Sequence, residues 1–153
     1  MTSEAPRVIV NRSPRCPPFV LFSVREISCL TSLLLDFLDL SGAGLEIELV
    51  GAREIARLNE DFLGCVGPTN VLSFQGDDFG EQQLGNLVLS VQAVQRESWL
   101  YGQEEQEHFL RLLAHGVLHM AGFDHGDRMH ELTEDAVGHC LDRFRKGKMP
   151  LQE

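Results

Sequence analysis

Three histidines with the spacing of a metal site stand in the last third of the chain: His115, His119 and His125. His115 and His119 are four residues apart, which places both side chains on one face of a helix. Gly122 can end that helix, because glycine accepts the left-handed conformation of helix ends, and the chain can then return His125 to the same point. Three neutral imidazoles suit Zn²⁺ and leave a fourth position open for water, the mark of a catalytic site. We therefore predict one Zn²⁺ per chain at these histidines.

The residue after the first histidine departs from the pattern of zinc peptidases. The spacing H-x-x-x-H-x-x-G-x-x-H is that of the metzincins, and zinc peptidases place a glutamate, their general base, directly after the first histidine. Here that residue is Gly116. The sequence thus predicts the ligands of a metal hydrolase without the base of a peptidase, and Gly116 argues against the alternative of a metzincin-like metallopeptidase.

Three segments together resemble one family. HGVLHMAGFDH (residues 115–125) resembles the H-G-x-L-H-x-x-G-x-D-H signature of the YbeY family, the bacterial rRNA maturation factors and metal-dependent endoribonucleases. TNVLSF (69–74) and GNLVLS (85–90) resemble two further signatures, and the resemblance extends over residues 45–144. It implies a zinc-dependent, single-strand-specific endoribonuclease that acts in 16S rRNA 3′ end processing and ribosome biogenesis. The implied partners are an rRNA precursor and the small ribosomal subunit, and neither DNA nor a membrane.

Two positions differ from the family pattern. The family usually carries an arginine, thought to contribute to RNA cleavage, where this chain has Leu63, and often an aspartate where it has Asn86. Arg57 is the nearest arginine in sequence, and we take it as the candidate to replace the missing one. An amide cannot act as a base, so Asn86 receives no acid–base role. Both differences favour another alternative, a non-catalytic ribosome-assembly factor with a structural zinc.

Several charged residues allow two interpretations each. Asp124 either orients a ligand histidine through a hydrogen bond or caps the turn, and we favour the first because it lies inside the signature. Arg53 and Arg57 either contact phosphate or form a solvated face neutralised by Glu54 and Glu60. His108, two turns before His115, either supports the site or is an ordinary surface histidine, which we expect.

The composition limits the class of protein. With 13 basic and 23 acidic residues, the net charge is −10, which argues against broad, charge-driven binding of nucleic acid but not against a local basic groove. The basic end around Arg143, Arg145, Lys146 and Lys148 either helps to hold RNA or is a solvated terminus. Four widely spaced cysteines indicate reduced, mostly buried thiols. Without a signal-peptide pattern or a long apolar run, we expect a cytoplasmic protein.

The elements that must position the histidines follow from apolar periodicity. The pattern predicts helices at residues 23–40, 51–62, 91–101, 103–121 and 129–144, and strands at residues 8–10, 45–50, 70–74 and 84–89. Their order predicts an α/β (α+β) fold in a single domain over residues 1–153, with a small mixed four-stranded sheet, about five helices and a central metal-binding helix. The strands near Val71 and Leu84 fit an antiparallel pair. We expect the side chains of Trp99 and Leu100 to be buried in the core.

Overall fold

The computed structural model describes residues 8–18, 21–76 and 83–147, and these residues form an α+β fold. The elements are β1 (Val8–Arg12), α1 (Val24–Phe37), β2 (Gly44–Val50), α2 (Ala52–Leu63), β3 (Val71–Gln75), β4 (Gln83–Ser90), α3 (Val91–Tyr101), α4 (Glu105–Met120) and α5 (Asp127–Arg145). Within the described residues, the predicted fold class with one mixed sheet of four strands and five helices is confirmed.

The sheet has the strand order β1-β2-β4-β3. β1, β2 and β4 run parallel, whereas β3 runs antiparallel to β4, with Val71 opposite Leu89. The predicted antiparallel pair is therefore confirmed. Because β3 pairs on one side only within the described part of the chain, it presents a free edge beside α4.

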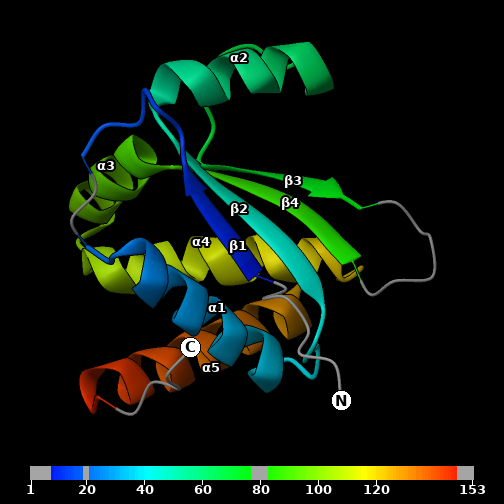
Figure 1. The fold of residues 1–153 in the computed structure, drawn as a ribbon, viewed down its shortest axis with the longest axis vertical. Coiled ribbons are helices and arrows are strands. Elements are labelled where there is room, and N and C mark those ends of the chain that lie inside the picture. Colours follow the sequence, from blue (N-terminus) through cyan, green and yellow to red (C-terminus); the bar gives the residue numbers. More distant parts are fainter. Residues whose placement is uncertain (1–7, 19–20, 77–82, 148–153) are drawn as a thin grey trace.

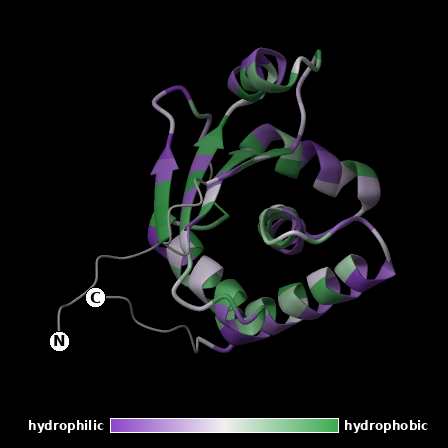
Figure 2. Ribbon diagram, turned by 90° about the vertical axis from the view of Figure 1, so that its right-hand side faces the viewer, coloured by the Kyte–Doolittle hydropathy of each residue, from purple (hydrophilic) through white to green (hydrophobic). Residues whose placement is uncertain are grey.

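The helices cover the two faces of the sheet unequally. α1 and α4 pack on one face, with α5 against these two helices, and α2 lies across the other face (Figure 1). Figure 2 views α4 end-on, and this helix lies between the sheet and α5. Its core side is apolar and buried, and includes Phe109, Leu113 and Val117, each 0% exposed. The prediction of a central helix that carries His115 and His119 is confirmed.

Gly116 is the point where α4 lies closest to the sheet. A Cβ atom built at this position would clash with Cδ1 of Leu87, a fully buried side chain of β4. The absence of a side chain at Gly116 therefore allows the close packing of helix on sheet. A side chain at position 116, where zinc peptidases have their glutamate, would point into the core and away from the histidines.

The predicted burial of the end of α3 was wrong. Trp99 is 81% exposed and Leu100 is 57% exposed. The buried stripe of α3 follows Val91, Val94 and Ser98, at spacings of three and four residues, and the next two positions turn away from it. Among the described residues, no helix has the length and apolar character needed to cross a membrane.

Candidate metal centre and cleft

The structure brings together the three histidines that the sequence singles out. The ring centroids of His115 and His119 are 4.6 Å apart, those of His119 and His125 are 4.6 Å apart, and those of His115 and His125 are 5.1 Å apart. One ring nitrogen from each can be chosen so that all lie within 4.8 Å of one another. His115 and His119 are half-buried, whereas His125 is exposed. This arrangement can hold one metal ion and leaves one side open to solvent.

The end of α4 explains how His125 reaches the other two histidines. Gly122 follows the helix with φ +96°, a left-handed conformation that favours glycine. The N–H of Phe123 donates to the carbonyl of Leu118 at 3.0 Å, which closes a Schellman-type turn. The chain then reverses before α5 begins at Asp127, and His125 lies in this short connection.

Burial holds His115 in the neutral form that metal binding needs. Desolvation lowers the pKa of His115 below its ordinary value of 6.5, and the neighbouring His119 and His125 lower it further. A neutral imidazole offers a lone pair, so no proton has to be displaced from His115 near pH 7.

A cleft of about 860 Å³ runs along α4 from the histidines, between this helix and the edge strand β3. Its lining includes His115, His119, Arg111, the strand residues 70–75 and Leu63. None of the described lining residues is Asp or Glu, although the whole chain has a net charge of −10. The cleft therefore suits an anionic ligand better than the rest of the acidic surface does.

His108 lines the same cleft and is 6% exposed, so the expected surface histidine was wrong. Its Nε2 lies 2.8 Å from Glu97 Oε1, and its Nδ1 lies 3.1 Å from Gln103 Oε1. Glu97 also accepts a hydrogen bond from the side-chain amide of Asn70, which lies in the segment TNVLSF (69–74) just before β3. His108 is thus a buried and fully partnered side chain that joins α3, α4 and β3 beside the cleft.

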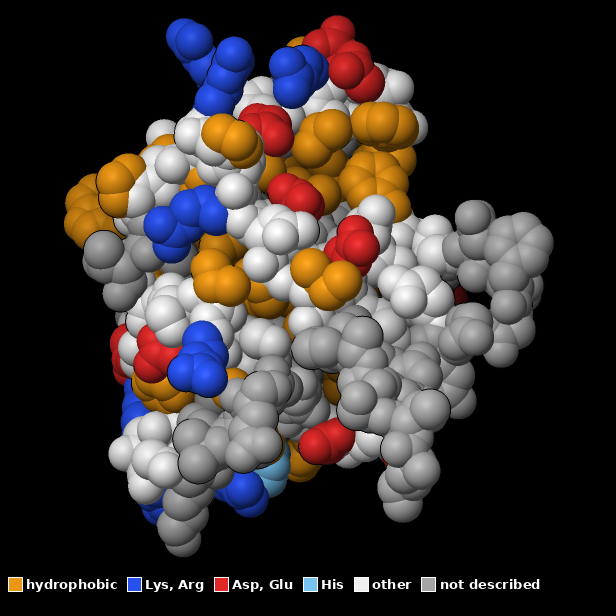
Figure 3. All heavy atoms as spheres, viewed as in Figure 1, with side chains coloured by type: hydrophobic (Ala, Val, Ile, Leu, Met, Phe, Trp, Pro, Cys, Tyr) orange, Lys and Arg blue, Asp and Glu red, His pale blue; other side chains and the backbone are white. Residues whose placement is uncertain are grey.

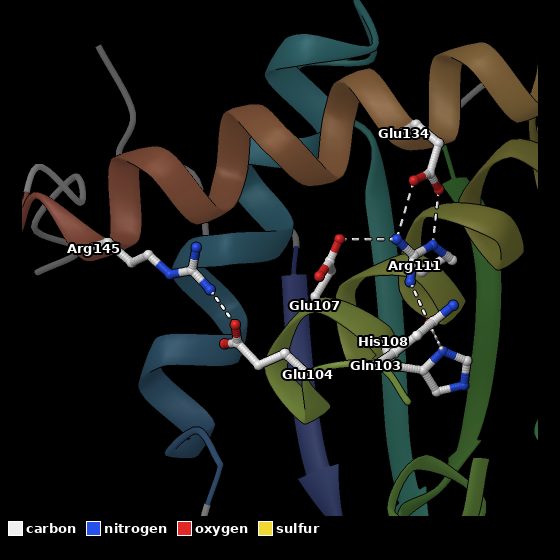
Figure 4. Close-up of polar contacts among 7 residues, drawn as sticks. All are labelled: Gln103, Glu104, Glu107, His108, Arg111, Glu134 and Arg145. Atoms are coloured by element: carbon white, nitrogen blue, oxygen red, sulfur yellow. Dashed lines mark hydrogen bonds and ion pairs between the residues drawn. The ribbon is translucent and has the colours of Figure 1, made fainter. Parts of the chain in front are cut away.

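Arg111 is the arginine that the structure places in the cleft, one helical turn before His115. Its guanidinium donates to Gln103, Glu107 and Glu134, as Figure 4 shows. Arg111 was not among the site residues predicted from the sequence. Its position offered a signal, because Arg111, His115 and His119 recur every four residues on one helix face.

The two tentative catalytic residues lie in different surroundings. Arg57 is exposed and lines a separate depression beside α2, which shares no lining residue with the cleft. Asp124 is exposed, and no hydrogen bond joins it to another of the described residues. The roles assigned to both residues stay predictions.

The two positions that differ from the family pattern line different pockets. Leu63 is 56% exposed and lines the cleft, so an arginine there would reach it. Asn86 lies in a groove with Leu58 and Phe62 of α2, on the sheet face opposite α4. A carboxylate in place of Asn86 would therefore point away from the histidines.

Comparison with known proteins gives one consistent result. The family model for endoribonuclease YbeY matches residues 25–138. Endoribonuclease YbeY of Oleidesulfovibrio alaskensis is 43% identical over 149 residues, covering 83% of this chain and 88% of the relative. The Nitratidesulfovibrio vulgaris protein of the same name is 39% identical, covering 85% and 92%.

A solved structure agrees in fold. The solution structure of TM1509 from Thermotoga maritima matches with a TM-score of 0.66 and 20% identity, covering 92% of this chain and 93% of that one. The chain therefore belongs to the endoribonuclease YbeY family, which confirms the predicted family and the prediction that the chain is an enzyme.

Proposed function

We propose that the protein is a zinc-dependent endoribonuclease that cleaves single-stranded RNA in the cleft beside His115, His119 and His125. The observation that carries the proposal is the convergence of these three imidazoles, two of which, His115 and His119, line a cleft whose described lining has no carboxylate. Membership of the endoribonuclease YbeY family supports RNA as the substrate. The resemblance of the three sequence segments to the signatures of this family also supports the proposal.

The donor set fits zinc. Three imidazole nitrogens, two from a rigid helix and one from the following turn, match a catalytic site with one open position. When bound, Zn²⁺ lowers the pKa of a coordinated water and polarises a phosphoryl oxygen. Imidazole also binds other divalent transition metals, so the experiment must identify which metal the protein contains.

We infer that a single RNA strand binds along the free edge of β3. Asn70 O accepts from Ser90 N, and Gly76 N donates to Leu84 O, so residues 70, 72, 74 and 76 face β4. The backbone N–H and C=O groups of Val71, Ser73 and Gln75 consequently point to the free edge, and all three residues line the cleft. An extended strand laid along this edge meets a row of donors and acceptors, with the histidines beside it.

We further propose that the substrate is an rRNA precursor, with processing of the 16S rRNA 3′ end on the small ribosomal subunit in the cytoplasm. The resemblance to the family of rRNA maturation factors supports this substrate. Either water or the 2′-hydroxyl of the RNA is the nucleophile, and an all-deoxy analogue separates the two because it lacks the 2′-hydroxyl.

The test compares the wild-type protein with His119→Ala and with His139→Ala as a matched control. His139 packs against Phe37, with ring centroids 4.9 Å apart, and is not one of the three clustered histidines. We expect about one zinc per chain and cleavage of unstructured RNA in the wild type and in His139→Ala, and neither in His119→Ala. RNA cleavage that persists in metal-free protein would contradict the proposal.

One alternative remains, a ribosome-assembly factor without catalysis. Leu63 favours it, because this side chain lines the cleft where the family carries an arginine. Retained association of His119→Ala with the small ribosomal subunit, together with wild-type protein that binds zinc but does not cut RNA, would support this alternative. A peptidase is disfavoured, because Gly116 faces the core.

A further inference from the structure

Three arginines surround a second depression, of about 670 Å³, at the start of α2. Arg15 comes from the loop after β1, and Arg53 and Arg57 come from α2, one helical turn apart. We call these three residues the arginine patch. Figure 3 shows Lys and Arg side chains gathered at the top of the molecule, where α2 lies in Figure 1.

The three side chains of the arginine patch have no direct ion-pair partner within the described part of the protein. No ion pair or hydrogen bond joins Arg15, Arg53 or Arg57 to another described residue. Glu54, which also lines the depression, accepts a hydrogen bond from the hydroxyl of Ser13 at 2.6 Å. Arg53 and Arg57 are exposed, as in the solvated face that is one of the two interpretations of the sequence, but neither forms an ion pair with Glu54 or Glu60.

Three basic side chains elsewhere in the described structure form ion pairs. Arg111 contacts Glu107 and Glu134, and Arg145 contacts Glu104 at 2.5 Å (Figure 4). Lys146 pairs with Asp142 at 3.1 Å. The basic end of the chain, which the sequence offered as a possible RNA contact, thus has carboxylate partners at these two positions, and the arginine patch has none.

Two members of the arginine patch repel each other when no anion is bound. Arg53 and Arg57 carry like charges four residues apart on one helix, an arrangement that destabilises helices. Arginine stays protonated at all ordinary pH values, so the repulsion cannot be relieved by loss of a proton. An anion in the depression removes this repulsion, and planar guanidinium groups are suited to bind phosphate through paired hydrogen bonds.

We propose that the arginine patch binds phosphate groups of the RNA at a site separate from the cleft, where the strand extends beyond the cleaved segment. The inference rests on the proposed function for the identity of the ligand. The patch and the cleft share no lining residue, and in Figure 1 α2 begins at the upper left whereas α4 ends at the right. Long RNA can therefore engage both sites, and a short oligonucleotide engages the cleft alone.

The experiment measures binding of uncleavable 2′-O-methyl RNA at several salt concentrations. One RNA is short, about 6 nucleotides, and one is long, about 30 nucleotides, against single-strand sites of roughly 4–16 nucleotides. The proteins are wild type, Arg53→Gln, Arg57→Gln, the double variant, and Arg145→Gln. Arg145→Gln changes the net charge by the same amount as each single variant but removes an arginine that already has a carboxylate partner.

For long RNA, each substitution in the arginine patch is expected to reduce the slope of log Kd against log salt by about 0.7, because one phosphate contact is lost. For short RNA, the affinity should stay within about twofold of wild type. An unchanged slope in the double variant, or an equal change in Arg145→Gln, would overturn the proposal. Wild-type protein that binds long RNA no more tightly than short RNA would overturn it as well.

This test is independent of the test of the nuclease. If the wild-type protein fails to cleave short RNA with zinc, the proposed function fails, and the salt dependence still reports on the arginine patch. If cleavage of short RNA succeeds and the slopes do not change, only the arginine patch is refuted. A variant in which binding of both RNAs weakens equally would assign the arginines to the cleft and contradict a separate site.

Discussion

Arg111 of α4 and Glu134 of α5 form a two-point ion pair beside the candidate metal centre. Nε of Arg111 donates to Oε2 of Glu134 at 2.8 Å, and Nη2 donates to Oε1 at 3.0 Å. Because the connection between α4 and α5 carries His125, this pair fixes the relation of the two helices on either side of a ligand. The side chains are 22% and 39% exposed, so solvent weakens the pair.

The ion pair predicts a specific dependence of stability on pH. The hydrogen bond from Arg111 lowers the pKa of Glu134 below its ordinary value of 4.5, against the opposing effect of burial. A lowered folded-state pKa stabilises the native protein above the unfolded value, and this contribution is lost as the pH falls through the folded value. Glu134→Gln should therefore reduce the free energy of unfolding by about 1 kcal/mol or less at neutral pH.

The measurement is urea unfolding of both proteins from neutral pH to below pH 4. The difference between wild type and Glu134→Gln should shrink as the pH falls below about 4.5. Asp142→Asn is the control, because Asp142 belongs to an exposed i,i+4 pair with Lys146. A difference that grows towards acid would refute the assignment of the stabilisation to ionised Glu134.

Any side chain at position 116 is expected to lower the stability of the protein. Gly116→Ala should destabilise the protein by roughly 1–3 kcal/mol, because the added methyl group clashes with Leu87 in a fully packed core. Gly138→Ala is the matched control, since a Cβ in this helix meets no atom within 4 Å. The control should be neutral or more stable by up to about 1 kcal/mol. Thermal unfolding of both variants measures the contrast, and equal effects would contradict the packing argument.

If the three histidines bind a metal ion, the metal should stabilise the folded protein, and this effect can be measured without an activity assay. A ligand that binds only the folded state raises the free energy of unfolding by about 2.7 kcal/mol at a concentration 100 times its Kd. Zinc should therefore raise the Tm of wild-type protein, whereas His115→Ala should respond weakly because one of three ligands is missing. Calorimetry with and without a chelator measures the shift. An equal shift in His115→Ala would place the zinc elsewhere.

The cysteines predict two classes of thiol reactivity. Cys65 is exposed, whereas Cys140 is buried, and burial raises the pKa of the Cys140 thiol to about 12. Because the thiolate is the reactive form, Cys65 should react rapidly with a disulfide reagent and Cys140 only after unfolding. Cys65→Ser should lose the fast phase of a thiol titration. A fast phase of unchanged size in Cys65→Ser would contradict the exposure of this residue.

The sequence alone predicted the fold class and the three histidines that cluster, because both depend on local patterns. The four-residue spacing of His115 and His119, with Gly122 at the helix end, defines a converging set without knowledge of the rest of the chain. The periodicity of apolar residues likewise predicted the helix that carries them. The predicted family rested on the same local segments.

Only the tertiary structure decided which residues surround the ligands. Sequence distance pointed to Arg57, but the packing of α4 beside β3 brings Arg111 into the cleft and leaves Arg57 in another depression. His108 is buried because α3 and β3 supply Glu97 and Asn70 around it. Such contacts join residues far apart in the chain, and they depend on strand order and helix packing, which periodicity does not specify.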